Sequence, residues 1–253
     1  MEMMQLLQAI FRWAHVVAGV VWIGLLYFFN FVNGPFQATM DGGTKKAVNP
    51  QLMPRALFWF RWGAAWTWIT GVLLLLLVFY HGRITLDLDR TWGVGGFLMI
   101  AVTFVAFLAY DALFKSPLGK DLKVGASIGF VLIALVVLGY VLAGFSYRAY
   151  VIHTGTLFGT IMAANVWMRI WPAQRKIITA TKEGTPPDAA LVALAGARSR
   201  HNTYLSVPLL WTMIDAHTSV PFAGSPLYLL AAVLVGWGTV NLLYKKAAKV
   251  PGF

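Results

Sequence analysis

Residues 7–33 read LQAIFRWAHVVAGVVWIGLLYFFNFVN, and this stretch decides the fold class. Arg12 is its one charged residue, and a helix of this length is long enough to cross the roughly 30 Å hydrocarbon core of a bilayer. The whole chain of 253 residues is 59% hydrophobic and 11% charged, with a mean hydropathy of +0.70. A soluble domain carries about 25% charged residues. The sequence therefore predicts an all-α integral membrane protein.

Apolar stretches of spanning length recur along the chain. They predict about seven transmembrane helices, at residues 7–33, 57–80, 93–114, 125–146, 150–171, 202–219 and 226–244. The sixth is the shortest and carries Pro208, so a kink or an earlier start is expected there. Two connections are long. Residues 34–56 are polar and rich in Gly and Pro, and a short interfacial helix is expected over residues 189–197.

The basic residues predict the orientation. Four lie on the side of the N-terminus, and the other sixteen lie on the opposite side, in a chain of net charge +11. The positive-inside rule then places the N-terminus outside and the C-terminus inside. The charge is a topology signal that also attracts membrane lipids, and no nucleic-acid partner is expected. The N-terminus lacks the basic segment of a cleaved signal peptide. The four basic residues on the side of the N-terminus are Arg12, Arg83, Arg90 and Arg148.

A weak internal repeat is also predicted. RWAHVVAGVVWIG (12–24) and YVIHTGTLFGTIM (150–162) each place a histidine shortly inside an inward-running helix. A four-helix offset preserves the direction of the chain, so the halves 1–148 and 149–253 would form a parallel repeat of one domain. The chain contains no cysteine, which excludes disulfides, thiol catalysis and covalent c-type haem.

Histidines are the first candidates for a functional site, since an ionisable ring in lipid is costly. His15 and His153 lie about 5 Å and 7 Å inside the outer interface, and His217 ends an outward-running helix at similar depth. His81 is expected in an aqueous loop. Histidine is the usual axial ligand of haem, so we expect a haem b whose iron is held by two of His15, His153 and His217.

Other interpretations of the same residues remain open. The rings could be hydrogen-bonded interfacial side chains, or could hold copper or zinc. Ala18, Gly19, Gly155 and Gly159 could admit a flat macrocycle or serve close helix packing. Asp215 could face a haem propionate or a proton path, or be an ordinary interfacial carboxylate.

Four stretches carry a family resemblance. They are HTGTLFGTIMAANVWMRIWPAQRK (153–176), ARSRHNTYLSVPLLWTMIDAHT (197–218), RWAHVVAGVVWIG (12–24) and FWFRWGAAWTWITG (58–71). Together they resemble the membrane domain of the bacterial cytochrome c-dependent urate oxidase family. The resemblance implies a multi-pass protein of the bacterial inner membrane that oxidises urate to 5-hydroxyisourate. The opening at His15 also resembles that of small four-helix haem b proteins, which favours His15 as a ligand.

The resemblance also covers polar residues towards the inner face. They suggest a site for an anion, a lipid headgroup or a quinone, with a basic boundary cluster as the alternative. The residues are Asn165, Gln174, Arg175, Arg200, His201 and Asn202.

The chain departs from the family pattern after its seventh span. Family members continue into an eighth helix and a cytochrome c domain, and a chain without cysteine has no such domain. We therefore expect a membrane-embedded b-haem oxidoreductase or electron-transfer module that passes electrons to a separate cytochrome c or partner subunit, within a complex or oligomer. Whether the chain itself is an enzyme is left open. A non-catalytic anchor or accessory subunit of a respiratory or photosynthetic complex is the alternative, and a permease is less favoured.

Overall fold

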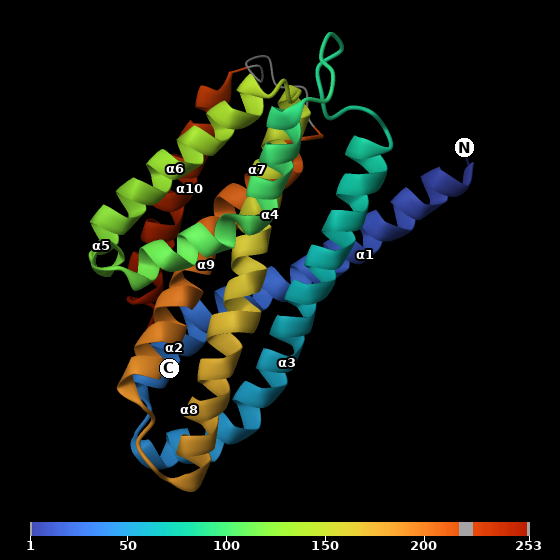
Figure 1. Ribbon diagram of the computed structural model, residues 1–253. Coiled ribbons are helices and arrows are strands. Elements are labelled where there is room, and N and C mark those ends of the chain that lie inside the picture. The colour runs from blue at the N-terminus through green and yellow to red at the C-terminus, as the bar shows by residue number, and fades with distance from the viewer. Residues whose placement is uncertain (1, 218–224, 252–253) are drawn as a thin grey trace. The chain divides into compact units, whose positions relative to one another are not determined.

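The computed structural model describes residues 2–217 and 225–251, and it confirms an all-α protein. Within these residues no strand occurs, and one isolated bridge joins Leu86 to Phe145. The elements are α1 (Glu2–Tyr27), η1 (Phe28–Asn33), α2 (Gly34–Thr39), α3 (Gly42–Leu74), η2 (Leu75–Tyr80), α4 (Val94–Lys115), α5 (Pro117–Lys120), α6 (Leu122–Leu142), α7 (Tyr147–Asn165), η3 (Val166–Ile170), α8 (Trp171–Glu183), α9 (Ala189–Asp215) and α10 (Pro226–Ala247). The same described residues contain three π-helical segments: η1 and η3 lie between α-helices, and η2 ends the long helix that begins with α3 (Figure 1).

Among the residues that the structure describes, five continuous helical stretches are long and apolar enough to cross a membrane, which supports a multi-pass membrane protein. They are Glu2–Thr39, Gly42–Tyr80, Val94–Lys115, Leu122–Leu142 and Pro226–Ala247. These stretches correspond to the first four predicted spans and the last one. The predicted fifth and sixth spans coincide with α7 and α9, which are helical but are not among the five.

Buried polar side chains explain why α7 and α9 differ from the other helices. α7 buries His153, Thr154 and Asn165, each at most 1% exposed, and α9 buries Arg198 and Asn202 at 2% and 0%. Such residues lower the mean hydropathy of a helix without exposing polar groups to lipid, because protein surrounds them. These two helices are therefore more polar than the five apolar stretches, and their polar side chains are well buried.

The two long connections contain more helix than their composition suggests. Residues 34–56 lie mostly in α2 and in the start of α3, where the Asp41 carboxylate accepts the Thr44 N–H at 3.0 Å and caps the helix. The helix expected to end at residue 197 instead continues to Asp215 as α9. Polar residues in the continuation, such as Asn202, are buried. The earlier start expected for the sixth span is confirmed.

The chain forms two compact units, each built from three segments. Unit 1 comprises Met1–Gln8, Val72–Ile161 and Val207–Gly236; unit 2 comprises Ala9–Gly71, Met162–Ser206 and Trp237–Phe253. Unit 1 has six basic and six acidic residues, whereas unit 2 has fourteen basic and three acidic residues. Unit 2 therefore carries the whole net charge of +11. The predicted repeat of halves 1–148 and 149–253 stays a prediction.

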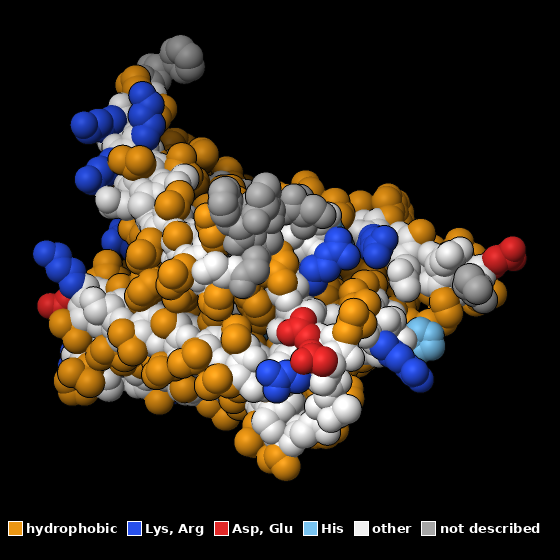
Figure 2. Space-filling model, turned by 90° about the horizontal axis from the view of Figure 1, so that it is seen from above, with side chains coloured by type: hydrophobic (Ala, Val, Ile, Leu, Met, Phe, Trp, Pro, Cys, Tyr) orange, Lys and Arg blue, Asp and Glu red, His pale blue; other side chains and the backbone are white. Residues whose placement is uncertain are grey.

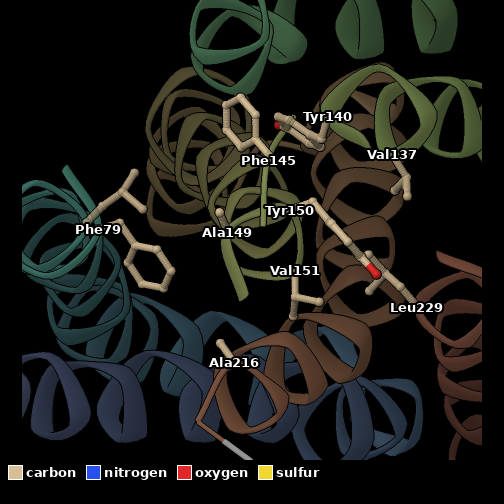
Figure 3. Close-up of a cluster of buried hydrophobic side chains, with 10 residues drawn as sticks. Phe79, Val137, Tyr140, Phe145, Ala149, Tyr150, Val151, Ala216 and Leu229 are labelled. Carbon is tan, nitrogen blue, oxygen red and sulfur yellow. The ribbon is translucent and has the colours of Figure 1, made fainter. Parts of the chain in front are cut away.

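In unit 1, α4 and α6 pack against each other and are joined by the single turn of α5 (Figure 1). Next to them lies a core cluster (Figure 3) made of Leu75, Phe79, Val137, Tyr140, Phe145, Ala149, Tyr150, Val151, Ala216 and Leu229. The loop over residues 81–93 is tied to the turn before α7, since the Ser146 N–H donates to the Thr85 carbonyl at 2.8 Å. This tie holds the end of η2 beside the start of α7.

In unit 2, α1 and α3 run past each other in opposite directions at close range. A Cβ added to Gly63 would lie 3.2 Å from the Trp22 nitrogen, and one added to Gly71 would lie 3.0 Å from Cε1 of His15. The glycines therefore allow the helices to approach. Hydrophobic side chains cover much of the face seen in Figure 2. Exposed examples are Trp13 and Val20 on α1, as expected of surfaces that face lipid.

Candidate functional site

His15 on α1 is held from one side by α3. Its Nδ1 lies 2.9 Å from the Thr67 carbonyl and 3.2 Å from Oγ1 of Thr70. The Thr70 hydroxyl itself donates to the Trp66 carbonyl at 2.6 Å, so its oxygen is available as an acceptor. Because both neighbours of Nδ1 accept, Nδ1 carries the proton and the Nε2 lone pair is free in the neutral ring.

The Nε2 atom of His15 makes no hydrogen bond within the described residues, and the side chain is half-buried. Gly71, also on α3, lies against the ring, where a methyl group would come within 3.0 Å of Cε1 and 3.4 Å of Nδ1. An anchored Nδ1–H and an open Nε2 are the arrangement of a histidine that ligates a metal, since a carbonyl on the far nitrogen fixes the tautomer and orients the ring.

His153 on α7 has the same tautomer in a closed setting. Its Nδ1–H donates to the Ala149 carbonyl, one turn earlier on the same helix, at 2.7 Å. Its Nε2 accepts the hydroxyl proton of Tyr80, also at 2.7 Å. The side chain is fully buried. Iron could reach this Nε2 only after Tyr80 had moved away.

Aromatic rings surround His153. The ring centroids of Phe145, Tyr80 and Tyr140 lie 4.9, 5.7 and 5.8 Å from that of the imidazole. Figure 3 shows Phe145 and Tyr140 beside each other in the core cluster. The Tyr140 hydroxyl is engaged separately, with Oγ1 of Thr103 at 2.7 Å. The ring environment of His153 is thus well packed.

Local sequence explains how the residues around His153 are positioned. Ser146 directly precedes α7, where its Oγ accepts the Ala149 N–H at 3.3 Å and its hydroxyl donates to the Ile84 carbonyl at 2.7 Å. Gly144, with φ of +80°, makes the preceding turn. Tyr80 is the last residue of η2, and π-helical segments often occur at functional sites.

The remaining predicted residues near the outer face differ in exposure. His81 lies in a turn and is exposed, as expected. His217 is exposed in the turn that follows α9. Asp215, 4% exposed, accepts a hydrogen bond from the Tyr147 hydroxyl through Oδ2. Within the part of the chain that the structure describes, no three His, Asp or Glu side chains gather as a metal site.

The small residues near the histidines serve different purposes. A Cβ on Gly155 would meet Oγ1 of Thr212 at 2.2 Å, so this glycine is required by close packing of α7 against α9 in unit 1. Gly159 and Gly19 are less crowded, with nearest neighbours at 3.9 Å and 3.8 Å. Close helix packing therefore accounts for Gly155.

The predicted inner-face residues fall into a buried pair and a surface group. Asn165 donates to Oδ1 of Asn202 at 2.9 Å, and Asn202 donates to the Met162 carbonyl at 2.9 Å; both side chains are fully buried. Gln174 and His201 are half-buried, and Arg175 and Arg200 are exposed. The Arg200 guanidinium lies 5.1 Å from the Tyr244 ring centroid. The structure thus brings Asn165 and Asn202 together in the interior.

Sequence reasoning missed the partners of these residues. Thr67, Thr70 and Tyr80 are ordinary helix residues by type, and only the packing of distant segments reveals their roles. Arg61 was also missed as a contact residue. Its guanidinium carbon lies 4.0 Å from the Trp171 ring centroid, a cation–π contact within unit 2. No sequence signal beyond the basic and aromatic composition marks this contact.

Comparison with protein families identifies the chain. The family described as urate oxidase N-terminal matches residues 42–249, which is most of the sequence. Curated proteins give no match, and solved structures give none either. The predicted resemblance is thereby confirmed at the level of the family. The chain belongs to the urate oxidase N-terminal family.

Proposed function

We propose that this protein is a membrane-embedded b-haem oxidoreductase or electron-transfer module that binds haem through Nε2 of His15. The open Nε2, with Nδ1 anchored by the Thr67 carbonyl at 2.9 Å, is the observation that supports the proposal most. Bound haem would supply one-electron redox chemistry. The chain would orient the ligand, keep its tautomer and limit water around it.

The second axial ligand is left to one of the other predicted histidines. His153 would first have to lose its bond from Tyr80. His217 lies in the exposed turn after α9. Urate is the proposed substrate, because the family carries its name. A separate cytochrome c or partner subunit is proposed as the electron acceptor.

The visible spectrum of the purified protein tests haem binding. We expect a b-type spectrum that sharpens on reduction with dithionite. His15→Ala should lose most of the haem, while His81→Ala, which changes an exposed loop ring, should keep it. A spectrum without haem, or normal haem content in His15→Ala, would refute the proposal. An absence of haem would favour an anchor or accessory subunit instead.

Reduction of the haem by urate tests the proposed substrate. Anaerobic addition of urate to the oxidised protein should reduce the haem band, and hypoxanthine should not. Reduction by both purines, or by neither, would reject urate specificity while leaving haem binding intact.

We further propose seven spans, with the N-terminus outside, in the bacterial inner membrane. α7 and α9 would then cross as protein-lined helices, in addition to the five apolar stretches. The chain has no cysteine, so single introduced cysteines report topology directly. Asp89→Cys should react with an impermeant maleimide in intact spheroplasts. Lys182→Cys should react only after permeabilisation, and the reverse pattern would invert the topology.

A further inference from the structure

We propose that Tyr80 and His153 form a proton-coupled redox pair, in which one-electron oxidation of the phenol is accompanied by transfer of its proton to Nε2 of His153. This role is independent of haem binding. It also assigns Nε2 of His153 a function other than iron ligation.

The direction of the hydrogen bond follows from the tautomer. The Ala149 carbonyl can only accept, so Nδ1 of His153 is the protonated nitrogen and Nε2 holds a lone pair. The Tyr80 hydroxyl, 2.7 Å away, must therefore donate to Nε2. A phenol that already donates to a neutral imidazole needs no rearrangement before it transfers its proton.

The proposed reaction moves one electron and one proton away from the Tyr80 hydroxyl. Tyr80 gives one electron to a high-potential one-electron acceptor, and its O–H bond breaks as a new N–H bond forms on His153. The products are a neutral phenoxyl radical and an imidazolium, and return of one electron reverses both changes. The Ala149 carbonyl, at 2.7 Å from Nδ1, stabilises the imidazolium because it accepts from the ring in both states.

The surroundings of the pair favour this reaction over loss of the proton to solvent. His153 has no exposed surface. Phe79 and Phe145 pack edge-on against its ring, at centroid distances of 6.4 and 4.9 Å. Both rings belong to the core cluster, where Figure 3 shows them on different elements. The proton therefore stays next to the oxygen from which it came.

An electron route to the surface exists as well. The Trp92 ring stacks on Tyr80, with a centroid distance of 5.8 Å and an interplanar angle of 21°. Trp92 is 43% exposed. The indole thus extends the aromatic system from the half-buried Tyr80 to the surface of unit 1.

Other tyrosines of unit 1 provide comparisons. The Tyr140 hydroxyl pairs with the hydroxyl of Thr103, which is too weak a base to hold a proton. Tyr147 donates to the Asp215 carboxylate, which is a base. Tyr140→Phe is therefore a matched control, and Tyr147→Phe tests the competing pair.

Photo-oxidation of the purified protein tests the proposal. Tris-bipyridyl ruthenium with persulfate supplies the one-electron oxidant, and electron paramagnetic resonance detects the radical. We expect a neutral tyrosyl radical that Tyr80→Phe removes and Tyr140→Phe preserves. His153→Leu should slow its formation at least tenfold and remove the solvent deuterium isotope effect. A radical that survives in Tyr80→Phe, or disappears in Tyr147→Phe, would overturn the assignment.

A second measurement needs no substitution, in case buried variants do not fold. Pulsed paramagnetic resonance on the wild-type protein labelled with ¹⁵N-histidine should show coupling of the radical to a histidine nitrogen through an exchangeable proton. A tyrosyl radical without that coupling would contradict proton transfer to His153.

Discussion

His15 in unit 2 and His153 in unit 1 are the same side chain in the same tautomer, yet their surroundings suit different chemistry. Both donate Nδ1–H to a backbone carbonyl, at 2.9 Å for His15 and 2.7 Å for His153. The carbonyl that accepts from His15 belongs to Thr67 on another helix, whereas the carbonyl that accepts from His153 belongs to Ala149 on the same helix. Nε2 is open in the first case and accepts from Tyr80 in the second.

This difference shows that the surroundings of Nε2, rather than the presence of a histidine alone, decide what such a site can do. An open Nε2 on a half-buried ring can ligate a metal. An enclosed Nε2 with a phenol on it can take a proton. The proposed functions of the two histidines therefore differ, although similar sequence surrounds both.

Chemical rescue should give the largest difference between the two sites. His15→Gly should lose most of its haem, and added imidazole should restore it, because the ring is half-buried and its Nε2 side is open. The measurement is the reduced spectrum at increasing imidazole concentration. N-methylimidazole, which lacks the N–H for the Thr67 carbonyl, is the control and should restore less haem. Equal rescue by both would show that the Thr67 anchor is unimportant.

Packing near His153 should be sensitive to one methyl group. Gly155→Ala places a Cβ 2.2 Å from Oγ1 of the buried Thr212, so we expect a loss of about 1–3 kcal/mol in the free energy of unfolding. Gly129→Ala on α6 meets nothing within 4 Å and should be neutral or stabilising by up to about 1 kcal/mol. Denaturant unfolding in detergent checks both. Equal stabilities would mean that α7 and α9 separate there at little cost.

A methyl group near His15 should act on the ligand more than on the fold. Gly71→Ala would crowd Cε1 at 3.0 Å and shift the imidazole from the Thr67 carbonyl, so we expect roughly tenfold weaker haem affinity. Gly24→Ala on α1, with open space around it, is the matched control. Haem titration of the apoprotein gives both affinities. Unchanged affinity in Gly71→Ala would argue against His15 as an oriented ligand.

The smallest expected effect concerns charge in unit 2. Hydrogen bonds from the Thr44 hydroxyl and then the Thr44 N–H hold the pKa of the exposed Asp41 carboxyl below its usual range. The resulting stabilisation is fully present above the usual pKa of about 3.9 and is lost as the pH falls through the lowered pKa. Melting of wild type and Asp41→Asn should therefore converge at low pH. A constant difference across pH would exclude the ionised carboxylate as its source.

The sequence predicted the helices better than it predicted the contacts of the candidate site. Long apolar runs were sufficient for the five spanning stretches, because hydrocarbon selects for them. The full length of α9 was not predicted: the sequence suggested a short helix over residues 189–197 and a separate span from residue 202, whereas α9 is continuous from Ala189 to Asp215. His15 and His153 were identified as candidates because placing an ionisable ring in lipid costs free energy. Their partners Thr67 and Tyr80 were not, because spacing along one helix carries no information on a neighbouring helix.

The polarity of α7 and α9 has a consequence for how the protein is made. A helix with His153, Thr154 and Asn165 partitions poorly from the translocon into lipid by itself. α1 to α6 leave the ribosome before α7, so earlier helices are present to receive it. α9 is followed by the apolar α10, which enters the bilayer readily. On the proposed topology of seven spans, insertion would therefore be sequential, and α7 and α9 would depend on their neighbours to enter the bilayer.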